Sequence, residues 1–459
     1  MEKRTTNIAI LGGGPAGYVA AIRAAQLGAE VILIEEKALG GVCLNVGCIP
    51  TKALLATASL LSNISSAKEH GITCELKSID WSVAAARKDR VVRSQGLGLE
   101  QLLNAKNITI IKGRGRVVSA HEIIAETTEG EVSIHCRKMI LATGSSPKIL
   151  PIPGAELALT SDDILALTEL PSSLAIIGAG VIGLEFATIF SAAGVKVTLI
   201  ELEDRLLSDE DEGAARELLK LLKRQGIAFK LGAEVLRIEQ QGDALTISYR
   251  SGNREQTVAA QKMLMAAGRK LNSDIFAALP LAIEGGAIVV NDRMETSVPD
   301  VYAAGDVIGG KLLAHLAFAE GKTAAENALG RERSLNYNAV PSCIYTNPEY
   351  ATAGLTEDQA IEQGINPRVG TFSFRHNGRA LTLGEREGFV KVIADENGII
   401  IGAHILGPEA SEMISEMTLA VTLGAKAEVL ADMIHPHPAL NEALWEACSA
   451  IAGQAIHQI

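Results

Sequence analysis

The sequence Asn7-Ile-Ala-Ile-Leu-Gly-Gly-Gly-Pro-Ala-Gly17 runs from a short aliphatic segment into a glycine-rich turn, and Val31-Ile-Leu-Ile-Glu35 follows after an alanine-rich stretch. The same order returns without a gap at Ser173-Leu-Ala-Ile-Ile-Gly-Ala-Gly-Val-Ile-Gly183 and Val197-Thr-Leu-Ile-Glu201. Each copy is typical of a βαβ unit in which a Gly-x-Gly-x-x-Gly turn binds a dinucleotide. A single copy would fit an ordinary glycine-rich turn, but two copies in register predict two dinucleotide-binding sites.

Each position of the repeated pattern has a physical role. The first glycine permits the tight turn, the second lets the backbone approach a pyrophosphate, and the third lets helix and strand pack closely. The terminal carboxylate can accept hydrogen bonds from ribose hydroxyls. In that order, these positions are Gly12, Gly14, Gly17 and Glu35 in the first copy, and Gly178, Gly180, Gly183 and Glu201 in the second. An acid at the last position repels a 2′-phosphate, so the second copy predicts NAD and not NADP.

Composition and charge narrow the choices of fold and partner. At roughly 100–200 residues per domain, the 459 residues suggest about three domains. Only 3% of the residues are aromatic while 44 are glycine, which favours α/β sheets over a β-sandwich. The net charge of −12 argues against nucleic-acid binding. The longest apolar run, Leu174–Leu184, is shorter than the roughly 20 residues of a membrane span, so no membrane association is expected.

The N-terminus and the cysteine content predict a cytoplasmic location. Lys3 and Arg4 before the apolar segment Ile8–Ala21 resemble a signal peptide. The same pattern recurs near residue 178, however, where it cannot be an export signal. Six cysteines in a chain of this length are also too few for a secreted scaffold held together by disulfides.

Cys43 and Cys48 stand close together in Gly40-Gly-Val-Cys-Leu-Asn-Val-Gly-Cys-Ile-Pro-Thr-Lys52. A zinc site would need a second pair of ligands, and the sequence has none, so no metal is predicted. Two inert buried cysteines would also fit the spacing. A redox-active pair is favoured because a nearby cation such as Lys52 lowers the pKa of a thiol and makes it more nucleophilic at neutral pH.

Three further segments resemble parts of flavoproteins that bind two dinucleotides. Thr296–Asp306 ends in Gly-Asp, and in those proteins this Asp holds the ribityl chain of the flavin. Ala142-Thr-Gly-Ser145 and Ala266-Ala-Gly-Arg269 resemble the points at which the chain leaves and re-enters the flavin domain. The Pro-, Ser- and Gly-rich residues 145–154 suit a domain boundary, and the Pro-containing stretch 337–341 marks the start of a C-terminal region.

The cysteine motif resembles the active-site motif of the pyridine nucleotide–disulfide oxidoreductases, which include dihydrolipoyl dehydrogenases, glutathione reductases and mercuric reductases. The resemblance covers essentially the whole chain. It implies an α/β fold with two Rossmann-like domains, for FAD and NAD, and a C-terminal α+β dimerisation domain. The implied boundaries are 1–145 for the FAD domain with the redox disulfide, 146–268 for the NAD domain, 269–336 for the central part of the FAD domain, and 337–459 for the dimerisation domain.

The same resemblance assigns roles to individual residues. Cys43 would exchange with the substrate, Cys48 would lie over the flavin as a thiolate, and Lys52 would form an ion pair with Glu185 near the flavin. The residues expected to bind FAD are Gly12, Gly14, Gly17, Glu35, Lys52, Thr143, Gly144 and Asp306. Those expected to bind NAD are Gly178, Gly180, Gly183, Glu201 and Gly268.

A second chemical cluster is His435-Pro-His-Pro-Ala-Leu-Asn-Glu442. Exchange between a dithiol and a disulfide needs a base, and His titrates in the right range. His437 is the predicted base and Glu442 orients it, while His435 is expected to be structural. In the family this His acts on the disulfide of the partner subunit, which implies an obligate homodimer. Ala439 stands where the family usually has Thr, a change expected to alter packing and not chemistry.

Three features favour the dihydrolipoyl dehydrogenase branch of the family. Glu201 favours NAD, the end at Ile-His-Gln-Ile459 has no cysteine pair of the kind that mercuric reductases need, and both active-site cysteines are present. The expected partners are a lipoyl-bearing acyltransferase or a glycine-cleavage carrier protein. Leu316, where the family often has Lys, is a departure from the pattern. Another disulfide reductase of the family, resembling glutathione or mercuric reductase, and a redox-inert flavin-binding module remain as alternatives.

Overall fold

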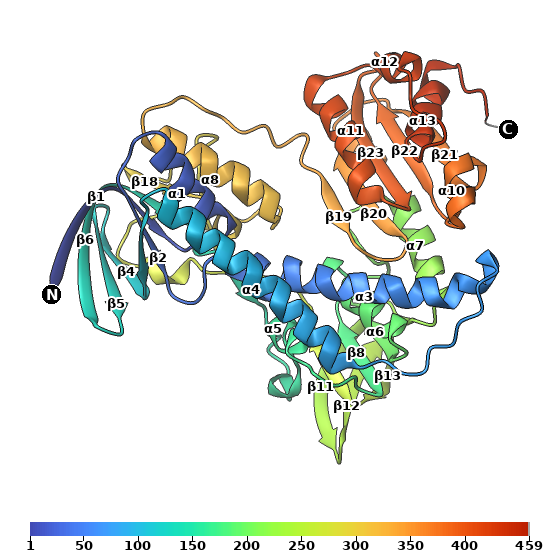
Figure 1. Cartoon of the computed structure of the whole chain (residues 1–459), viewed down its shortest axis with the longest axis horizontal. Coiled ribbons are helices and arrows are strands. Elements are labelled where there is room, and N and C mark those ends of the chain that lie inside the picture. The colour runs from blue at the N-terminus through green and yellow to red at the C-terminus, as the bar shows by residue number, and fades with distance from the viewer. Residues whose placement is uncertain (458–459) are drawn as a thin grey trace.

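The computed structural model describes residues 1–457, so the last two residues of the Ile-His-Gln-Ile459 end lie outside the description. Three sheets organise the chain, and each carries its own helices (Figure 1). The first and second sheets have parallel strands at their centres, and the third is antiparallel throughout. This is the α/β architecture predicted from the sequence, with two Rossmann-like units and a C-terminal α+β unit.

The first sheet has seven strands in the order β3-β2-β1-β6-β5-β4, and β18 pairs with the far end of β6. Strands β1, β2, β3, β6 and β18 run parallel, whereas β4 and β5 pair antiparallel with each other and β5 pairs antiparallel with the first half of β6. The strands are β1 (Glu2–Leu11), β2 (Val31–Glu35), β3 (Thr109–Lys112), β4 (Arg114–Ser119), β5 (Glu122–Thr127), β6 (Gly130–Leu141) and β18 (Val301–Ala303).

The last four residues of β1, Ile8–Leu11, are buried on both faces of the sheet, which explains their unbroken aliphatic sequence. Ile8 and Ile10 point to the face covered by α1 (Pro15–Gln26) and α8 (Ala314–Ala328). These two helices lie side by side (Figure 1). They pack so closely that a Cβ on Gly321 would lie 2.1 Å from the carbonyl oxygen of Ala16. The packing holds α1, and with it the first glycine-rich turn, in place.

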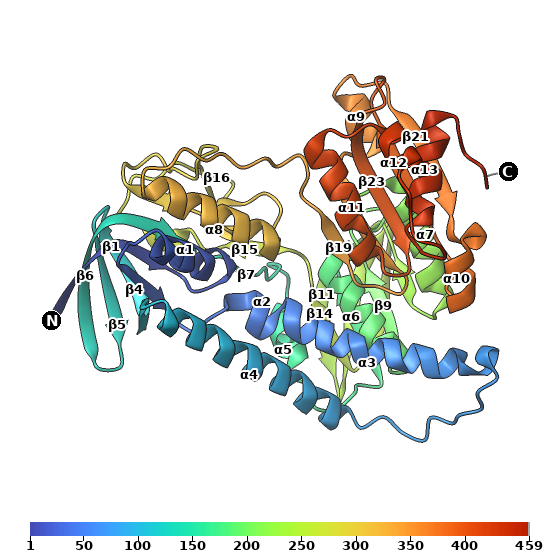
Figure 2. The same ribbon diagram turned by 45° about the horizontal axis from the view of Figure 1, so that its top comes forward.

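A pair of long helices extends from the first unit alongside the second one (Figure 2). The helical segments are α2 (Gly41–Val46), α3 (Cys48–Ser66), η1 (Ala67–His70) and α4 (Trp81–Ala105). Residues 41–70 are long and apolar enough to cross a membrane, by length and composition only. A core helix of a globular protein passes the same test, and α3 packs here against α4 and against α6 of the second unit.

The second unit has a four-stranded parallel sheet in the order β10-β9-β8-β14 and a separate antiparallel sheet β11-β12-β13. Leu174 and Ile176 of β8 face one core cluster, and Ala175 and Ile177 face another, as the alternation of a doubly covered strand requires. The elements are η2 (Ala155–Leu157), α5 (Ser161–Leu165), β8 (Ser173–Ile177), α6 (Val181–Ala192), β9 (Lys196–Ile200), α7 (Glu212–Arg224), β10 (Ala228–Lys230), β11 (Ala233–Gln241), β12 (Ala244–Ser251), β13 (Arg254–Ala260) and β14 (Lys262–Met265).

Two short strands join the first and second units. β7 (Ser145–Pro147) and β15 (Arg269–Leu271) pair antiparallel, so the chain leaves and re-enters the first unit at one place. The remaining elements of this region are η3 (Asp274–Phe276), β16 (Ile283–Glu284), β17 (Ala287–Ile288) and η4 (Asp306–Ile308).

The C-terminal unit is a five-stranded antiparallel sheet in the order β19-β20-β23-β22-β21. Helices α11 and α13 cover one face, and the other face supplies Ile344, Tyr350 and Leu406 to the core of the second unit. The elements are β19 (Ser342–Ile344), β20 (Glu349–Gly354), α9 (Glu357–Glu362), β21 (Arg368–Ser373), η5 (Phe374–His376), α10 (Gly378–Leu383), β22 (Phe389–Ala394), β23 (Ile400–Gly407), α11 (Ala410–Leu423), α12 (Ala427–Asp432) and α13 (Glu442–Ala452).

Candidate active site

The two neighbouring cysteines lie on either side of a break between helices. Cys43 belongs to the short helix α2, Gly47 separates the helices, and Cys48 is the first residue of α3. Both side chains are half-buried thiols with no bond between them, so the structure holds the pair as a dithiol. A Cβ on Gly47 would lie 2.8 Å from the carbonyl oxygen of Val42, so this tight break requires glycine.

The two thiols differ in pKa. Hydrogen bonding to Cys48 and burial raise the pKa of Cys43. The hydrogen bond from Cys43 lowers the pKa of Cys48 to about 7, with a further contribution from the charge of Lys52, although burial opposes both. Cys48 also stands at the N-terminus of α3, where the helix dipole favours a negative charge. Cys48 is therefore the residue of the pair that holds a thiolate near neutral pH.

Lys52 lies one turn along α3 from Cys48 and joins three segments of the chain. Its ammonium group donates to both carboxylate oxygens of Glu185 on α6, each at 2.8 Å, so the expected ion pair is present. The same nitrogen lies 4.5 Å from the ring centroid of Tyr345, within the range of a cation–π contact. The backbone NH of Tyr345 donates to Glu185 at 3.2 Å. The cation beside the dithiol is thus fixed from two sides.

The first glycine-rich turn has the shape of a dinucleotide cradle. Gly12 and Gly17 are enclosed by backbone, since added Cβ atoms would lie 2.2 Å from the carbonyl oxygen of Ala142 and 1.8 Å from that of Gly12. Gly14 is open, with its nearest neighbour at 3.8 Å. Glu35 accepts from the backbone NH of Gly13 at 2.6 Å. The open middle glycine and the acid at the end of β2 fit a pyrophosphate and a ribose.

Asp306, the residue expected at the flavin ribityl chain, lies with Thr143 and Gly144, which were expected to bind FAD, at the junction of the first two units. Asp306 accepts a hydrogen bond from the hydroxyl of Ser145, and the guanidinium of Arg269 donates to the same hydroxyl at 2.6 Å. Thr143 donates to the carbonyl oxygen of Asn272 at 2.9 Å, and the backbone carbonyl of Gly144 accepts from the NH of the same Asn at 3.0 Å. Sequence analysis placed Ser145 and Arg269 at the crossover points but missed that they hold Asp306.

The second glycine-rich turn repeats the first almost position by position. Added Cβ atoms on Gly178 and Gly183 would lie 2.4 Å and 2.0 Å from backbone oxygens, whereas nothing lies within 4 Å of Gly180. Glu201 accepts from the backbone NH of Ala179 at 2.6 Å. Gly268, at φ +105°, directly precedes the return into the first unit. This cradle likewise fits a dinucleotide with a free ribose hydroxyl.

His437 and Glu442 form a hydrogen-bonded pair on the C-terminal unit. Nδ1 of His437 lies 2.8 Å from Oε1 of Glu442 at the start of α13. Burial opposes ionisation of Glu442, but the hydrogen bonds from His437 and the backbone NH of Ala439 lower its pKa. Nδ1 therefore donates to a carboxylate, which leaves Nε2 as the free base. The His437 side chain is 78% exposed.

His437 and the cysteines are not brought together within one chain. No hydrogen bond or ion pair joins them among residues 1–457. His435 differs from His437 in its surroundings, because its side chain is only 4% exposed and bonds to Glu416 at 3.0 Å and to the carbonyl oxygen of Met433 at 3.1 Å. That environment suits a structural histidine.

The comparisons with known proteins agree over nearly the entire length. Residues 6–321 match the pyridine nucleotide-disulphide oxidoreductase family, and residues 340–448 match the dimerisation domain of that family. The dihydrolipoyl dehydrogenase of Bacillus subtilis (strain 168) is 41% identical over 470 residues, which cover 98% of this chain and 99% of the relative. The mitochondrial dihydrolipoyl dehydrogenase of Pisum sativum is 39% identical over 467 residues, which cover 98% and 92%.

Solved structures show the same fold. LpdA from Mycobacterium tuberculosis has a TM-score of 0.90 at 28% identity, with 98% of this chain and 100% of that chain covered. The Cu(II) complex of the HOCl-induced flavoprotein disulfide reductase RclA from Escherichia coli has a TM-score of 0.87 at 30% identity, with 97% and 99% covered. The chain therefore belongs to the pyridine nucleotide-disulphide oxidoreductase family and is an oxidoreductase that uses FAD and a pyridine nucleotide.

Proposed function

We propose that this protein is a dihydrolipoyl dehydrogenase, which oxidises dihydrolipoamide to lipoamide through Cys43 and Cys48 and reduces NAD⁺ to NADH. The observation that carries the proposal is the pair of unlike thiols on either side of the break between α2 and α3. Cys48 lies at the N-terminus of α3, one turn from Lys52, and its pKa is lowered to about 7 while that of Cys43 is raised. One thiol is suited to hold charge beside a flavin and the other to exchange with a substrate. Relatives of that name at 38–41% identity support the choice of substrate.

The chain's own residues account for the exchange step. Nε2 of His437 takes a proton from one thiol of dihydrolipoamide, and the resulting thiolate attacks Sγ of Cys43. The Cys43–Cys48 bond breaks and Cys48 leaves as a thiolate beside Lys52. The second substrate thiol then gives up its proton and attacks the substrate sulfur of the mixed disulfide, which releases lipoamide. Of the two substrate protons, one ends on Sγ of Cys43 and the other on Nε2 of His437.

The dinucleotides would occupy the two cradles in chain order. The residues proposed to hold FAD are Gly12, Gly14, Gly17, Glu35, Lys52, Thr143, Gly144 and Asp306. Those proposed to hold NAD are Gly178, Gly180, Gly183, Glu201 and Gly268. When bound, FAD supplies the route by which two electrons of the dithiol reach NAD⁺. Glu201 favours NAD over NADP because its carboxylate repels a 2′-phosphate.

The proposed enzyme is a homodimer in which His437 serves the dithiol of the partner subunit. The match of residues 340–448 to a dimerisation domain supports this arrangement. Beside His437, the C-terminal unit also exposes large apolar side chains that a monomer would leave in water: Leu419, Leu423, Val429, Met433 and Ile434. Ile434 is 95% exposed. An apolar surface of this kind next to a catalytic base fits an obligate interface.

The same proposal includes the domain boundaries, the partner proteins and the location in the cell. The domains are bounded at residues 145, 268 and 336. The partner is a lipoyl-bearing acyltransferase or a glycine-cleavage carrier protein, and the location is the cytoplasm.

A substrate panel tests the proposed activity. Purified protein with FAD bound should reduce NAD⁺ with dihydrolipoamide and prefer NAD⁺ to NADP⁺, and Cys43→Ser should abolish this reaction. Faster turnover of glutathione disulfide with NADPH would contradict the proposal.

Anaerobic reduction by dithionite distinguishes a redox enzyme from a flavin-binding module whose disulfide is inert. The enzyme takes up electrons into both the disulfide and FAD, twice the uptake of the flavin alone.

A further inference from the structure

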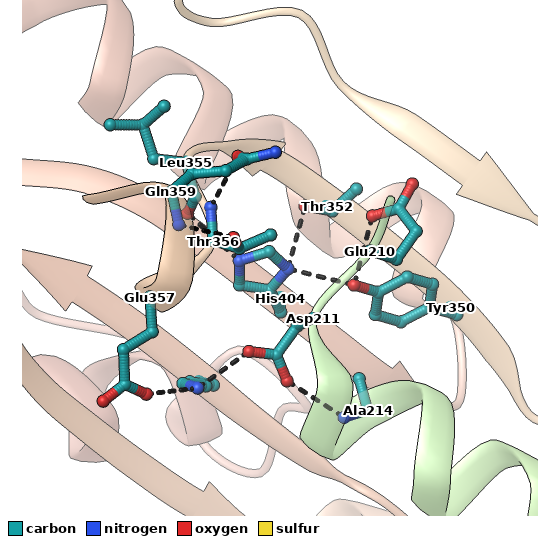
Figure 3. Close-up of polar contacts among 11 residues, drawn as sticks. Glu210, Asp211, Ala214, Tyr350, Thr352, Leu355, Thr356, Glu357, Gln359 and His404 are labelled. Carbon is teal, nitrogen blue, oxygen red and sulfur yellow. Dashed lines mark hydrogen bonds and ion pairs between the residues drawn. The ribbon is translucent and has the colours of Figure 1, made fainter. Parts of the chain in front are cut away.

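A cluster of polar side chains is buried between the second unit and the C-terminal unit (Figure 3). Glu210 and Asp211 come from the loop between β9 and α7 of the second unit. Tyr350, Lys391 and His404 come from three adjacent strands of the C-terminal sheet, β20, β22 and β23. None of these residues belongs to the proposed catalytic or dinucleotide-binding sets.

Asp211 makes two different contacts with its two carboxylate oxygens. Oδ1 accepts from the backbone NH of Ala214 at 2.9 Å and caps α7, while Oδ2 accepts from the ammonium of Lys391 at 2.7 Å. Lys391 also pairs with Glu357 at 2.7 Å. Burial opposes ionisation of Asp211, but Lys391 and the Ala214 NH lower its pKa overall. The side chains of Asp211 and Lys391 are only 4% and 13% exposed. Loss of the Lys391 charge therefore leaves Asp211 buried without a cation, and loss of the Asp211 charge leaves Lys391 with Glu357 as its one acidic partner.

His404 forms a second, uncharged connection beside the ion pair. Its Nε2 donates to the carbonyl oxygen of Leu355 at 3.1 Å, because a carbonyl can only accept, and Nδ1 is left as an acceptor that faces the hydroxyls of Thr352 at 2.9 Å and Tyr350 at 3.0 Å (Figure 3). Burial lowers the pKa of His404 to about 4, which keeps the ring neutral. The Tyr350 hydroxyl also lies 3.3 Å from a carboxylate oxygen of Glu210. Both residues at the end of the loop thus contact the C-terminal sheet.

The loop that ends at Asp211 begins at Glu201, the acid at the end of β9. Oε1 of Glu201 accepts from the backbone NH of Glu203 at 2.9 Å, and the carbonyl oxygen of Glu203 accepts from the NH of Gly232 at 2.8 Å. Between the two ends, Leu206 and Leu207 are buried in the core cluster that the second unit shares with the C-terminal sheet. The loop is therefore one packed segment with the ribose acid at one end and the ion pair at the other.

We propose that Asp211 and Lys391 are positioning residues for the pyridine nucleotide, and that their ion pair holds loop 201–211 so that Glu201 meets the ribose in the binding geometry. The inference rests on the proposed use of NAD by the second glycine-rich turn. Its consequence is that the C-terminal unit, which carries His437, also sets the affinity of the second unit for the nucleotide.

Two variants test the pair, and a third serves as a control. Lys391→Met removes the ammonium, and Asp211→Asn keeps an oxygen to cap α7 but removes the charge. Lys220→Met is the matched control, because Lys220 lies on α7 with a 57% exposed side chain and an ion pair within its own helix. The measurements are the Kd of NAD⁺ by calorimetry, the KM and kcat for NADH with an artificial dye as acceptor, FAD content and Tm.

We expect both test variants to raise the Kd of NAD⁺ and the KM for NADH by about fivefold or more while kcat stays within about twofold, since mispositioning weakens binding more than the chemical step. Lys220→Met should match the wild type. The double variant should be little worse than either single one, because the two charges act as a unit.

A lowered Tm with unchanged Kd and KM would show a merely structural pair and overturn the inference. If Lys391→Met loses FAD or fails to fold, the milder Asp211→Asn decides between the same two outcomes. Wild-type protein that neither binds NAD⁺ nor oxidises NADH would overturn the proposed function, and this inference with it. Wild-type binding together with unchanged variants would overturn only this inference.

Discussion

At the scale of single residues, charged side chains next to the reacting and ligand-binding groups explain most of the proposed chemistry. Lys52 stabilises negative charge on Cys48, Glu442 holds Nδ1–H of His437, and Glu201, the proposed ribose acceptor, is held by the backbone NH of Ala179. The contacts of Glu442 with His437 at 2.8 Å and of Glu201 with the Ala179 NH at 2.6 Å each involve a carboxylate, which makes the hydrogen bond stronger than one between neutral groups. Predictions at this scale therefore concern charge.

Reversing the charge at the end of β9 should change nucleotide preference. Glu201→Arg replaces a carboxylate that repels a 2′-phosphate with a cation that attracts it. We expect the ratio of kcat/KM for NAD⁺ to that for NADP⁺ to fall by about tenfold or more, as a change of about 1.4 kcal/mol would give. Steady-state kinetics with both nucleotides measure this. An unchanged ratio would show that this residue does not meet the ribose.

Removing the partner thiol should expose the Cys48 thiolate. In Cys43→Ser no disulfide can form, so Cys48 should donate to the flavin and give a long-wavelength absorption band without any reductant. Because the thiolate fraction rises with pH, the band should grow as the pH is raised from acidic to alkaline values, and the charge of Lys52 still lowers the pKa of Cys48 in this variant although the hydrogen bond from the Cys43 thiol is lost. Absorption spectra across this range test the assignment. A band in Cys48→Ser and none in Cys43→Ser would reverse the roles.

At the scale of elements, the two βαβ units were predictable because their features are local. The glycines, the aliphatic strands and the terminal acids all lie within one short unit, so spacing alone places them. The antiparallel sheet β11-β12-β13 and the position of Tyr345 beneath Lys52 were not predictable in this way. Both features depend on which segments pack together across long distances in the sequence, and local sequence periodicity does not predict such packing.

Within one glycine-rich turn, the second and third glycines should respond in opposite ways. Gly180 has φ −80° and nothing within 4 Å of an added Cβ, so Gly180→Val should fold normally but lower NAD⁺ affinity by about tenfold or more, by occupying the pyrophosphate space. At Gly183 the Cβ would lie 2.0 Å from a backbone oxygen, so Gly183→Val should lose about 1–3 kcal/mol of stability or more. Calorimetric titration and thermal unfolding distinguish these effects. Full NAD⁺ affinity in folded Gly180→Val would contradict the account.

At the scale of the whole molecule, the proposed active site is divided between chains. The sequence motifs identified the dithiol and the base separately, but their spatial relation came only from the family resemblance. The structure adds that His437 and Glu442 of the same chain form a hydrogen-bonded pair. The Asp211–Lys391 pair escaped sequence analysis because its members are 180 positions apart and neither lies in a motif.

Disrupting the apolar surface beside His437 should separate the subunits. Ile434 is the most exposed large apolar side chain of this surface, and Ile434→Glu places a charge there. Burying that charge in the subunit interface costs free energy, which should shift the protein toward monomers. We expect loss of dihydrolipoamide oxidation, with NADH-to-dye transfer retained. Analytical ultracentrifugation with parallel assays tests this. The control Ile361→Glu, at a 56% exposed residue on α9, should stay dimeric, and a dimeric, active Ile434→Glu would contradict this placement of the interface.

The central claim is that His437 of one subunit serves the dithiol of the other, and subunit mixing tests it most directly. His437→Ala should lose about 10²–10⁴ in the rate of dihydrolipoamide oxidation, as expected for a missing general base, and Cys43→Ser should be inactive. When the two inactive proteins are mixed under dissociating conditions and reassembled, one site of each mixed dimer regains both groups. If half of the dimers are mixed, activity should return to about a quarter of wild type. No recovery, with mixed dimers verified by mass, would place His437 and its disulfide in the same subunit and contradict the account.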